Sequence, residues 1–297
     1  MTLIALLVAL ILERLATRLL HLREAGWLEA YARWAAVLAA RRPRPLAIAT
    51  CFVLVILPVL PVAALAAFLA QAAPGPAWLV FASIVLVFSL GPRDLAEEVD
   101  EYLEREKAGD AEGAGRAAAV IIEHDAAQRR DIRARAVEDA VFVQANNRIF
   151  GVLFWFVLLG PAGLGPAAAW LFRVSDHMRR ESIALAAVPA EGAGTNCPER
   201  LHFLLAWAPA RLLALSYALA GSFEEARRGW RDRYGELPER LLERNDRLLM
   251  LVGRGALGRG PGAESGGPVE SAMRLVRRAL LMWLTVIALL SLSAWIV

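Results

Sequence analysis

The chain has 297 residues, of which 58% are apolar and 21% are charged, and its formal net charge is +3. The apolar content is too high for an ordinary soluble domain, and the charged content is too high for a bundle that faces only lipid. In the arginine-rich stretch 224–260, nine arginines are interleaved with seven acids, which excludes the one-sided basic face of a nucleic-acid binder.

Charge is distributed unevenly along the chain. Residues 46–92 contain no Asp, Glu, Lys or Arg, whereas residues 93–148 contain fourteen acids and nine bases. This division predicts an all-α, polytopic integral membrane protein with amphipathic cytoplasmic helices and a short re-entrant hairpin. We expect one membrane domain over residues 1–297, with a cytoplasmic helical region at 93–148 inside it.

The first apolar helix is interrupted early by charge. Glu13 and Arg14 follow the apolar run Met1–Leu12, and a carboxylate near membrane depth is a candidate functional residue. The alternative is that the helix lies along the interface, where both side chains reach water. We therefore leave open whether residues 1–20 span the membrane.

A membrane hairpin is expected next. Leu46–Ala70 is long enough to cross a bilayer, with Pro58 and Pro61 as kinks. Pro74–Pro76 is a tight turn, and Ala77–Leu90 is the return limb. Because arginines surround the hairpin but are absent from its turn, the turn is expected to face outward and the polar regions the cytoplasm.

Two amphipathic helices are expected in the charged region, at Asp94–Lys107 and from Arg116 to about Arg148, packed on each other and on the inner membrane face. Asn146, Asn147 and Arg148 directly precede an apolar run. They either bind phosphate oxygens or mark the boundary with water.

The run Ile149–Phe172 is uncharged, but Gly160–Pro166 divides it, which predicts a re-entrant or hairpin element. Beyond it, Ser175-Asp176-His177 places a carboxylate beside an imidazole, as Glu123-His124-Asp125 does earlier. Adjacent helical residues point in different directions, so we expect both triplets to be charges on a helix surface.

Leu201–Phe223 is long enough to span, but it carries Arg211 near its middle. An arginine there is costly unless it is paired or hydrated. Two interpretations are open, a structural ion pair with Asp176 or Glu138, and an anion-binding site that uses the fork of the guanidinium. We expect this segment to dip into the membrane rather than cross it.

The remainder of the chain is predicted as a cytoplasmic polar region at 222–278, a Gly-rich linker over Gly253–Pro268 and a C-terminal transmembrane helix at 279–297. Cys51 and Cys197 form no CxxC pair, and we expect free thiols. No P-loop, HExxH or GxSxG motif is present, and no metal site is predicted.

These positions resemble the AmpE family of inner-membrane proteins and, more distantly, the CobD/CbiB cobinamide-phosphate synthases. The likeness covers most of the chain. The matching positions are Glu13-Arg14, Asp125 with Glu123 and His124, Glu138 with Asn146, Asn147-Arg148 before Leu153-Phe154-Trp155, Asp176 with Met178, and Pro209-Ala210-Arg211.

The resemblance implies roles for these residues. Glu13, Glu138 and Asp176 are the candidate catalytic residues, and the candidate ligand-binding residues are Asp125, Asn146, Asn147, Arg148 and Arg211. The distant enzymes use ATP and magnesium to form an amide. Here Glu123 and His124 replace a glycine and an arginine of their pattern, and Arg173-Val174-Ser175 replaces Asn-Thr-Leu.

The first hypothesis is therefore a multi-pass protein of the bacterial inner membrane that signals cell-wall status and affects β-lactamase induction. Its expected partners are the lipid bilayer, a small anionic ligand or a nucleotide bound on the cytoplasmic side, and a second copy of the chain in a homo-oligomer. The second hypothesis is a membrane-bound ligase that forms an amide with ATP and Mg²⁺. A transporter of an anionic metabolite is a third, but the chain lacks the internal repeat that many such folds show.

Overall fold

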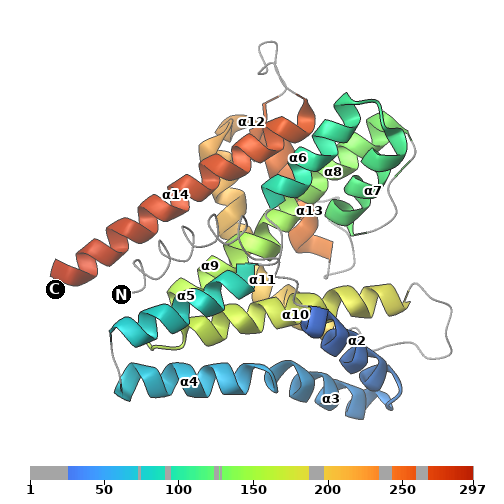
Figure 1. The fold of residues 1–297 in the computed structure, drawn as a ribbon. Helices are drawn as coiled ribbons and strands as arrows, with labels where there is room; N and C mark the ends of the chain where they lie inside the picture. The colour runs from blue at the N-terminus through green and yellow to red at the C-terminus, as the bar shows by residue number, and fades with distance from the viewer. Residues whose placement is uncertain are drawn as a thin grey trace. The chain divides into compact units, whose positions relative to one another are not determined.

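The computed structural model describes residues 26–72, 75–90, 95–123, 127, 129–186, 197–233, 243–258 and 267–296. Every regular element within these ranges is a helix, which confirms the predicted all-α class (Figure 1). In chain order they are α2 (Gly26–Ala40), α3 (Arg44–Ile56), α4 (Val59–Ala72), α5 (Pro76–Leu90), α6 (Leu95–Lys107), α7 (Ala111–Ile122), α8 (Arg130–Ala145), the π-helix η2 (Asn146–Phe150), α9 (Gly151–Leu158), α10 (Gly165–Ala186), α11 (Cys197–Ala220), α12 (Phe223–Arg233), α13 (Arg244–Ala256) and α14 (Pro268–Ile296).

The helices form two compact units, and each unit combines segments that are far apart in the sequence. Unit 1 contains α2 to α5, α9, α10 and α11 as far as Ala206. Unit 2 contains α6 to α8, η2, α11 from Trp207, and α12 to most of α14. The domain boundaries expected above stay predictions.

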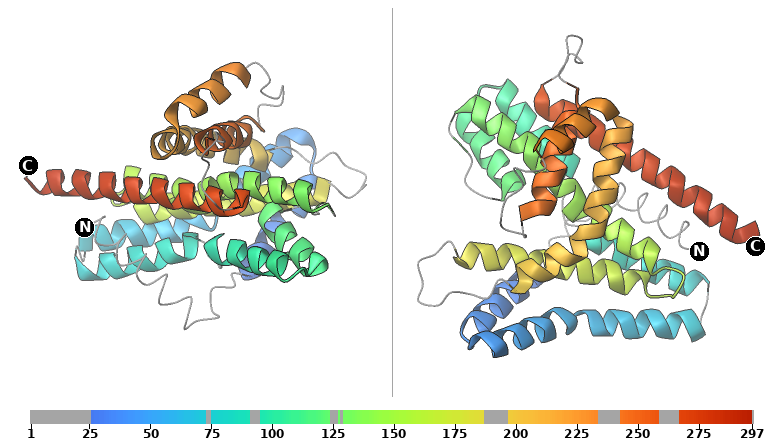
Figure 2. Two further views of the ribbon diagram at one scale, coloured as in Figure 1. Left: turned by 90° about the horizontal axis from the view of Figure 1, so that it is seen from above. Right: turned by 180° about the vertical axis from the view of Figure 1, so that it is seen from behind.

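In unit 1, α10 is the central helix and contacts α2, α3, α4, α5 and α9 (Figure 2). Trp170, Val174 and Met178 recur every four residues and therefore share one face of α10. They pack in a core with Cys51 and Cys197. Both cysteines are buried free thiols, as predicted.

The breaks expected in the apolar segments are confirmed. The helix stops between Ile56 and Val59, where Pro58 lacks the N–H that a continuous helix would need. Gly75 has a φ of +128°, which a glycine adopts without strain, and α5 begins one residue later. Since α4 packs on α5 and α9 on α10, both segments are helical hairpins. How deep the α9–α10 hairpin enters the membrane stays a prediction.

Four helical stretches in the described part of the chain are long and apolar enough to cross a membrane: Pro45–Ala72, Pro76–Lys107, Arg130–Leu158 and Cys197–Ala220. Phe52, Val53 and Phe68 on the first are exposed, as a lipid-facing surface requires. These helices indicate a polytopic protein in a bilayer.

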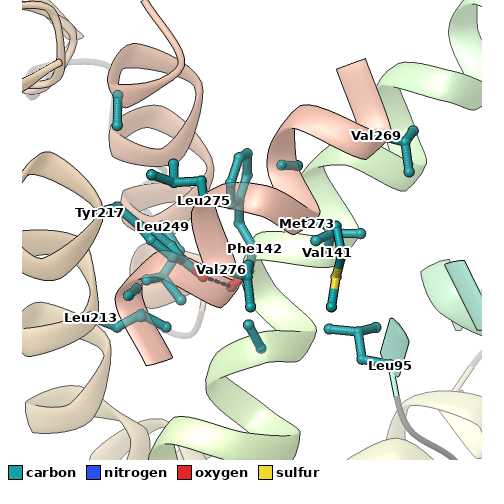
Figure 3. Packing of buried hydrophobic residues seen from close by; sticks show 14 of the residues in the cluster. Leu95, Val141, Phe142, Leu213, Tyr217, Leu249, Val269, Met273, Leu275 and Val276 are labelled. Carbon is teal, nitrogen blue, oxygen red and sulfur yellow. Dashed lines mark hydrogen bonds between the residues drawn. The ribbon is translucent and has the colours of Figure 1, made fainter. Parts of the chain in front are cut away.

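The core of unit 2 is built around α8, which packs on α6, α7 and α13. Figure 3 shows Val141 and Phe142 of α8 among apolar side chains of α11, α13 and α14. The hydroxyl of Tyr217 donates a hydrogen bond of 3.2 Å to the carbonyl of Phe142, and the two rings meet edge to face. This contact satisfies the polar end of a fully buried tyrosine.

The helix predicted from Arg116 to about Arg148 is wrong, because the structure has two helices there. Helix α7 ends at Ile122, and Glu123 follows in the left-handed conformation with a φ of +65°. That conformation ends a helix and is usually taken by glycine, so the sequence carries no plain stop signal at this point. Helices α6, α7 and α8 pack on one another, as expected for amphipathic helices.

Asp110 caps α7, and this cap gives a pH-dependent prediction. Its carboxylate accepts a hydrogen bond of 2.9 Å from the N–H of Gly113. That bond, opposed by burial and assisted by Arg105, lowers the pKa of Asp110 below 3.8. Because folding lowers this pKa, the cap stabilises α7 above about pH 3.8 and is lost as the pH falls through the lowered value.

We expect the protection of the first amides of α7 against hydrogen exchange to fall below about pH 3.8 in the native protein. Asp110→Asn should lack this fall, because a neutral side-chain oxygen caps without titrating. The same pH dependence in both proteins would contradict the assignment of the cap.

Part of the predicted Gly-rich linker is helical, since α13 continues to Ala256. A Cβ atom on Gly253 would lie 2.7 Å from ring atoms of the buried Phe142. We expect Gly253→Ala to destabilise the protein by about 1–3 kcal/mol through overpacking. Gly115→Ala in α7, where nothing lies within 4 Å, should instead be stabilising. Thermal unfolding in detergent measures both, and shifts of the same sign would contradict this packing.

The C-terminal helix is longer than predicted, because α14 begins at Pro268. Val269, Ala272 and Val276 of its first half are buried in the core of unit 2. Further along, Leu281 and Leu289 are exposed. This change fits a helix whose first half packs in the protein core and whose second half faces lipid. That α14 crosses the membrane stays a prediction.

Candidate functional site

A polar cluster lies inside unit 2, where α8 passes into η2. We call it the Arg148 cluster, and its members are Glu98, Gln144, Asn146, Asn147 and Arg148, all buried. The guanidinium of Arg148 donates to Glu98 Oε2 at 2.6 Å and to Gln144 Oε1 at 3.2 Å. Such a buried ionic group within a candidate membrane span, Arg130–Leu158, is typical of a functional site.

Three members of the cluster, Asn146, Asn147 and Arg148, belong to a π-helix. Residues Asn146–Phe150 form η2, and π-helical turns are frequent at functional sites. Asn146 Nδ2 donates to Asn147 Oδ1 at 3.2 Å, while the buried Oδ1 of Asn146 has no hydrogen-bond partner among the described residues. A buried polar atom of this kind is a ready acceptor for a ligand.

Glu98 also lines a small hollow between α6 and α7. The hollow has a volume of about 140 Å³ and is lined further by Glu101, Arg105 and Arg116. It is smaller than the roughly 300 Å³ of a typical small-molecule pocket, so it would have to widen for a nucleotide. Glu98 thus connects the Arg148 cluster to a polar opening.

Arg211 lies in the same unit, and its side chain is well supported. Its Nη1 donates to the carbonyl of Trp207 at 2.8 Å and to Asn245 Oδ1 at 2.9 Å. The guanidinium carbon lies 4.1 Å from the centre of the Trp207 ring, a cation–π contact. These contacts account for an arginine in an apolar run, and its predicted ion pairs with Asp176 or Glu138 stay predictions.

The second polar cluster belongs to unit 1 and surrounds Asp176. We call it the Asp176 cluster. The fully buried carboxylate of Asp176 accepts hydrogen bonds from Arg179 Nη2 at 2.8 Å and Arg180 Nε at 2.9 Å. Arg173 Nη1 is 3.7 Å from it and His202 Nε2 is 3.8 Å from it. The expectation that Ser175-Asp176-His177 is a surface group is therefore wrong, because α10 is surrounded by other helices.

The arrangement of Ser175, His202 and Asp176 looks like a nucleophilic triad but differs from one in its geometry. The hydroxyl of Ser175 donates to the carbonyl of Phe172 at 2.7 Å and lies 3.1 Å from His202 Nδ1. Its single proton is thus committed to a carbonyl, and the 3.8 Å from His202 to Asp176 exceeds a hydrogen bond. The three residues therefore do not form a nucleophilic triad.

Asp176 carries a permanent charge. Burial by itself would raise the pKa of Asp176, but the charges of Arg180 and Arg179 outweigh it and hold that pKa well below 3.8. Asp176 is therefore ionised near neutral pH and is unsuited to donate a proton.

Other predicted site residues are dispersed or lie elsewhere. Glu138 is fully buried on α8, two turns before the Arg148 cluster. Glu13 and Asp125 lie outside the described residues. Within the described ranges, no three His, Cys, Asp or Glu side chains gather closely enough to hold a metal ion, so we derive no step through magnesium.

Sequence reasoning missed Glu98, Gln144 and Asn245, each of which contacts a predicted residue. A signal for Glu98 was present. It falls on the same helix face as Leu95 and Tyr102, both buried, so a carboxylate stands on an apolar stripe.

Helices of membrane-crossing length around two buried charge clusters define this chain as a polytopic membrane protein. Residues 1–297 match the family model described as regulatory signalling modulator protein AmpE. The chain belongs to the AmpE family, which confirms the resemblance seen in the sequence.

Two curated relatives are cobalamin biosynthesis proteins CobD. The one from Stutzerimonas stutzeri is 31% identical over 222 residues, which are 70% of this chain and 64% of the relative. The one from Chromobacterium violaceum is 28% identical over 239 residues, which are 71% of this chain and 69% of the relative. The chain thus spans about two thirds of the length of these relatives. No solved structure matches it.

Proposed function

We propose that this chain is a regulatory protein of the bacterial inner membrane that links cell-wall status to β-lactamase induction by binding an anionic ligand at the Arg148 cluster. Membership of the AmpE family supports the regulatory role. The observation that carries the site is the buried cluster at η2, with its unpartnered Asn146 oxygen inside a candidate membrane span.

The chemistry of the cluster supports a ligand with both an acidic group and a hydrogen-bond donor. Arg148 supplies a guanidinium, whose fork suits carboxylates and phosphates. Asn146 Oδ1 is an acceptor, and the wall of the hollow has two arginines beside Glu98 and Glu101. A muropeptide carries carboxylates and amide donors that match these groups chemically, and the hollow would have to widen to admit it, as for a nucleotide. Arg211 and Asp125 are further candidates for its contacts.

Deletion of the gene and complementation test this role in cells. Deletion should change β-lactamase induction, and the wild-type gene should restore it. Asn146→Leu should fail to restore it, because it removes the acceptor while the residue remains buried. Ser216→Ala, which removes another buried polar group of unit 2, is the control that should restore it. Unchanged induction and muropeptide handling after deletion would end the proposal.

An amide-forming ligase that uses ATP is the second candidate, favoured by the CobD relatives and by the buried carboxylates of Glu138 and Asp176. Calorimetry on the purified protein separates the two. The regulatory role predicts binding of muropeptide fragments that is lost in Asn146→Leu. Binding of ATP with Mg²⁺, followed by its consumption with a carboxylic acid and an amine, would favour the ligase.

A further inference from the structure

An open groove with a volume of about 790 Å³ lies in unit 2 between α11 and α12. Its walls are mainly apolar, and they include Leu212 and Leu215 of α11 and Phe223 and Trp230 of α12. The described residues that line it also include three arginines, Arg211, Arg227 and Arg231, and no acid. The groove is within the size range of ligand sites.

Close packing of glycines holds the groove open. A Cβ on Gly221 would lie 2.3 Å from the carbonyl oxygen of Ala256, and one on Gly255 would lie 2.8 Å from the Cα of Ala226. The N–H of Ser222 also donates to Ala256 O at 2.7 Å. Helix α12 is thus fixed on α13, which leaves the apolar face of α11 uncovered beside it.

The uncovered face of α11 beside the groove is apolar and exposed. Leu212, Leu215 and Leu219 recur at helical spacing and are about half exposed, at 44%, 49% and 58%. They belong to the candidate span Cys197–Ala220, whose exposed apolar residues must meet acyl chains in a bilayer. One wall of the groove is therefore a lipid-facing surface.

The other wall has the composition of a membrane interface. Trp230 is part-exposed, and tryptophan favours the headgroup level of a bilayer. Arg227 and Arg231 are one helical turn apart on α12 and both line the groove. Arg228 lies on the same helix but is not among the lining residues. Both Arg227 and Arg228 pair with Glu224, and Arg228 also pairs with Glu225, so the position at the groove is what distinguishes them.

We propose that this groove binds one anionic phospholipid of the bilayer, with an acyl chain against Leu212 and Leu215 and the phosphate at Arg227 and Arg231. The arginines favour an anionic headgroup over a neutral one. The groove is continuous with the lipid-facing side of α11, which places an acyl chain of the same lipid beside it. The proposed phosphate ligands Arg227 and Arg231 lie outside the Arg148 cluster, and Arg211, which also lines the groove, is unchanged in every variant, so the two proposals can be tested separately.

Native mass spectrometry of the full-length protein in a neutral detergent tests it, with phosphatidylglycerol and phosphatidylcholine as probes. We expect tighter binding of phosphatidylglycerol. Arg227→Gln with Arg231→Gln should weaken it by about 25-fold, or roughly fivefold for each arginine. The matched control Arg228→Gln should stay within about twofold of wild type. Leu215→Trp, a change at an exposed position that fills the groove, should weaken binding without affecting folding.

Equal binding of the two lipids would overturn the proposal, as would an equal loss in Arg228→Gln. Competition by inorganic phosphate alone would also overturn it, because it would mark a site for a free anion. Lipid that binds only when it is in excess in the detergent solution, and is lost on dilution, would be an adventitious additive only. That outcome would also overturn the proposal. Muropeptide binding should be unchanged in all these variants, so the failure of one proposal is distinguishable from the failure of the other.

Discussion

Asp176→Asn should destabilise the protein by about 3–5 kcal/mol, because it leaves the buried Arg173 and the partly buried Arg179 and Arg180 without their carboxylate. Asp176 accepts hydrogen bonds from Arg179 and Arg180, and Arg173 lies 3.7 Å away. Because folding lowers the pKa of Asp176, its contribution is present above pH 3.8 and is lost only as the pH falls through the lowered value. The loss in the variant is therefore expected at every physiological pH.

Thiol labelling measures this effect within unit 1. Cys51 and Cys197 are the two cysteines of the chain, and both are buried in the core beside Val174 and Met178. We expect a maleimide to label them much faster in Asp176→Asn than in the wild type. Glu181→Gln is the control, because Glu181 pairs with the exposed Arg33, and exposed pairs contribute about 1 kcal/mol or less. If Asp176→Asn were labelled at the wild-type rate and unfolded at the wild-type temperature, Asp176 would not stabilise unit 1 by pairing with these arginines.

The second large effect is expected at the Glu98–Arg148 pair. Glu98→Leu or Arg148→Met alone should cost about 3–5 kcal/mol, since each leaves an uncompensated buried charge. The double variant should regain most of that loss, because an apolar pair of similar volume removes both charges together. A double-mutant cycle on thermal unfolding in detergent measures the coupling between the two side chains.

The double-mutant cycle shows whether Glu98 and Arg148 contact each other in the folded protein. Strong coupling is expected for side chains joined at 2.6 Å in a buried site. Additive single effects would mean that Glu98 and Arg148 do not contact each other in the folded protein. The double variant is useful beyond stability, because it folds without the charges that the proposed ligand would meet.

Local rules predicted most of the helices. Pro58 and the Gly160–Pro166 run end helices because proline lacks the N–H and glycine tolerates turn conformations, so both breaks could be placed from the sequence. The break after Ile122 could not, since Glu123 adopts a conformation that its type rarely takes. The cap at Asp110 was a readable signal that the helix starts earlier than Arg116.

The candidate site was predictable in part. Asn146, Asn147 and Arg148 were identified at the edge of an apolar run, and all three are buried in η2. The partner of Arg148 could not be identified by spacing, because Glu98 is fifty positions away and their meeting depends on how α6 packs near α8. Asp176 was expected at a surface, since helical spacing alone does not reveal that α10 is enclosed by five other helices.

Complementation with the Glu98→Leu, Arg148→Met double variant tests the proposed function most directly. The variant removes the charges of the Arg148 cluster while the stability of unit 2 is largely kept. In a strain that lacks the gene, we expect it to reach wild-type levels in the membrane and to fail to restore β-lactamase induction. Full restoration of induction by this variant would contradict a regulatory site at the Arg148 cluster.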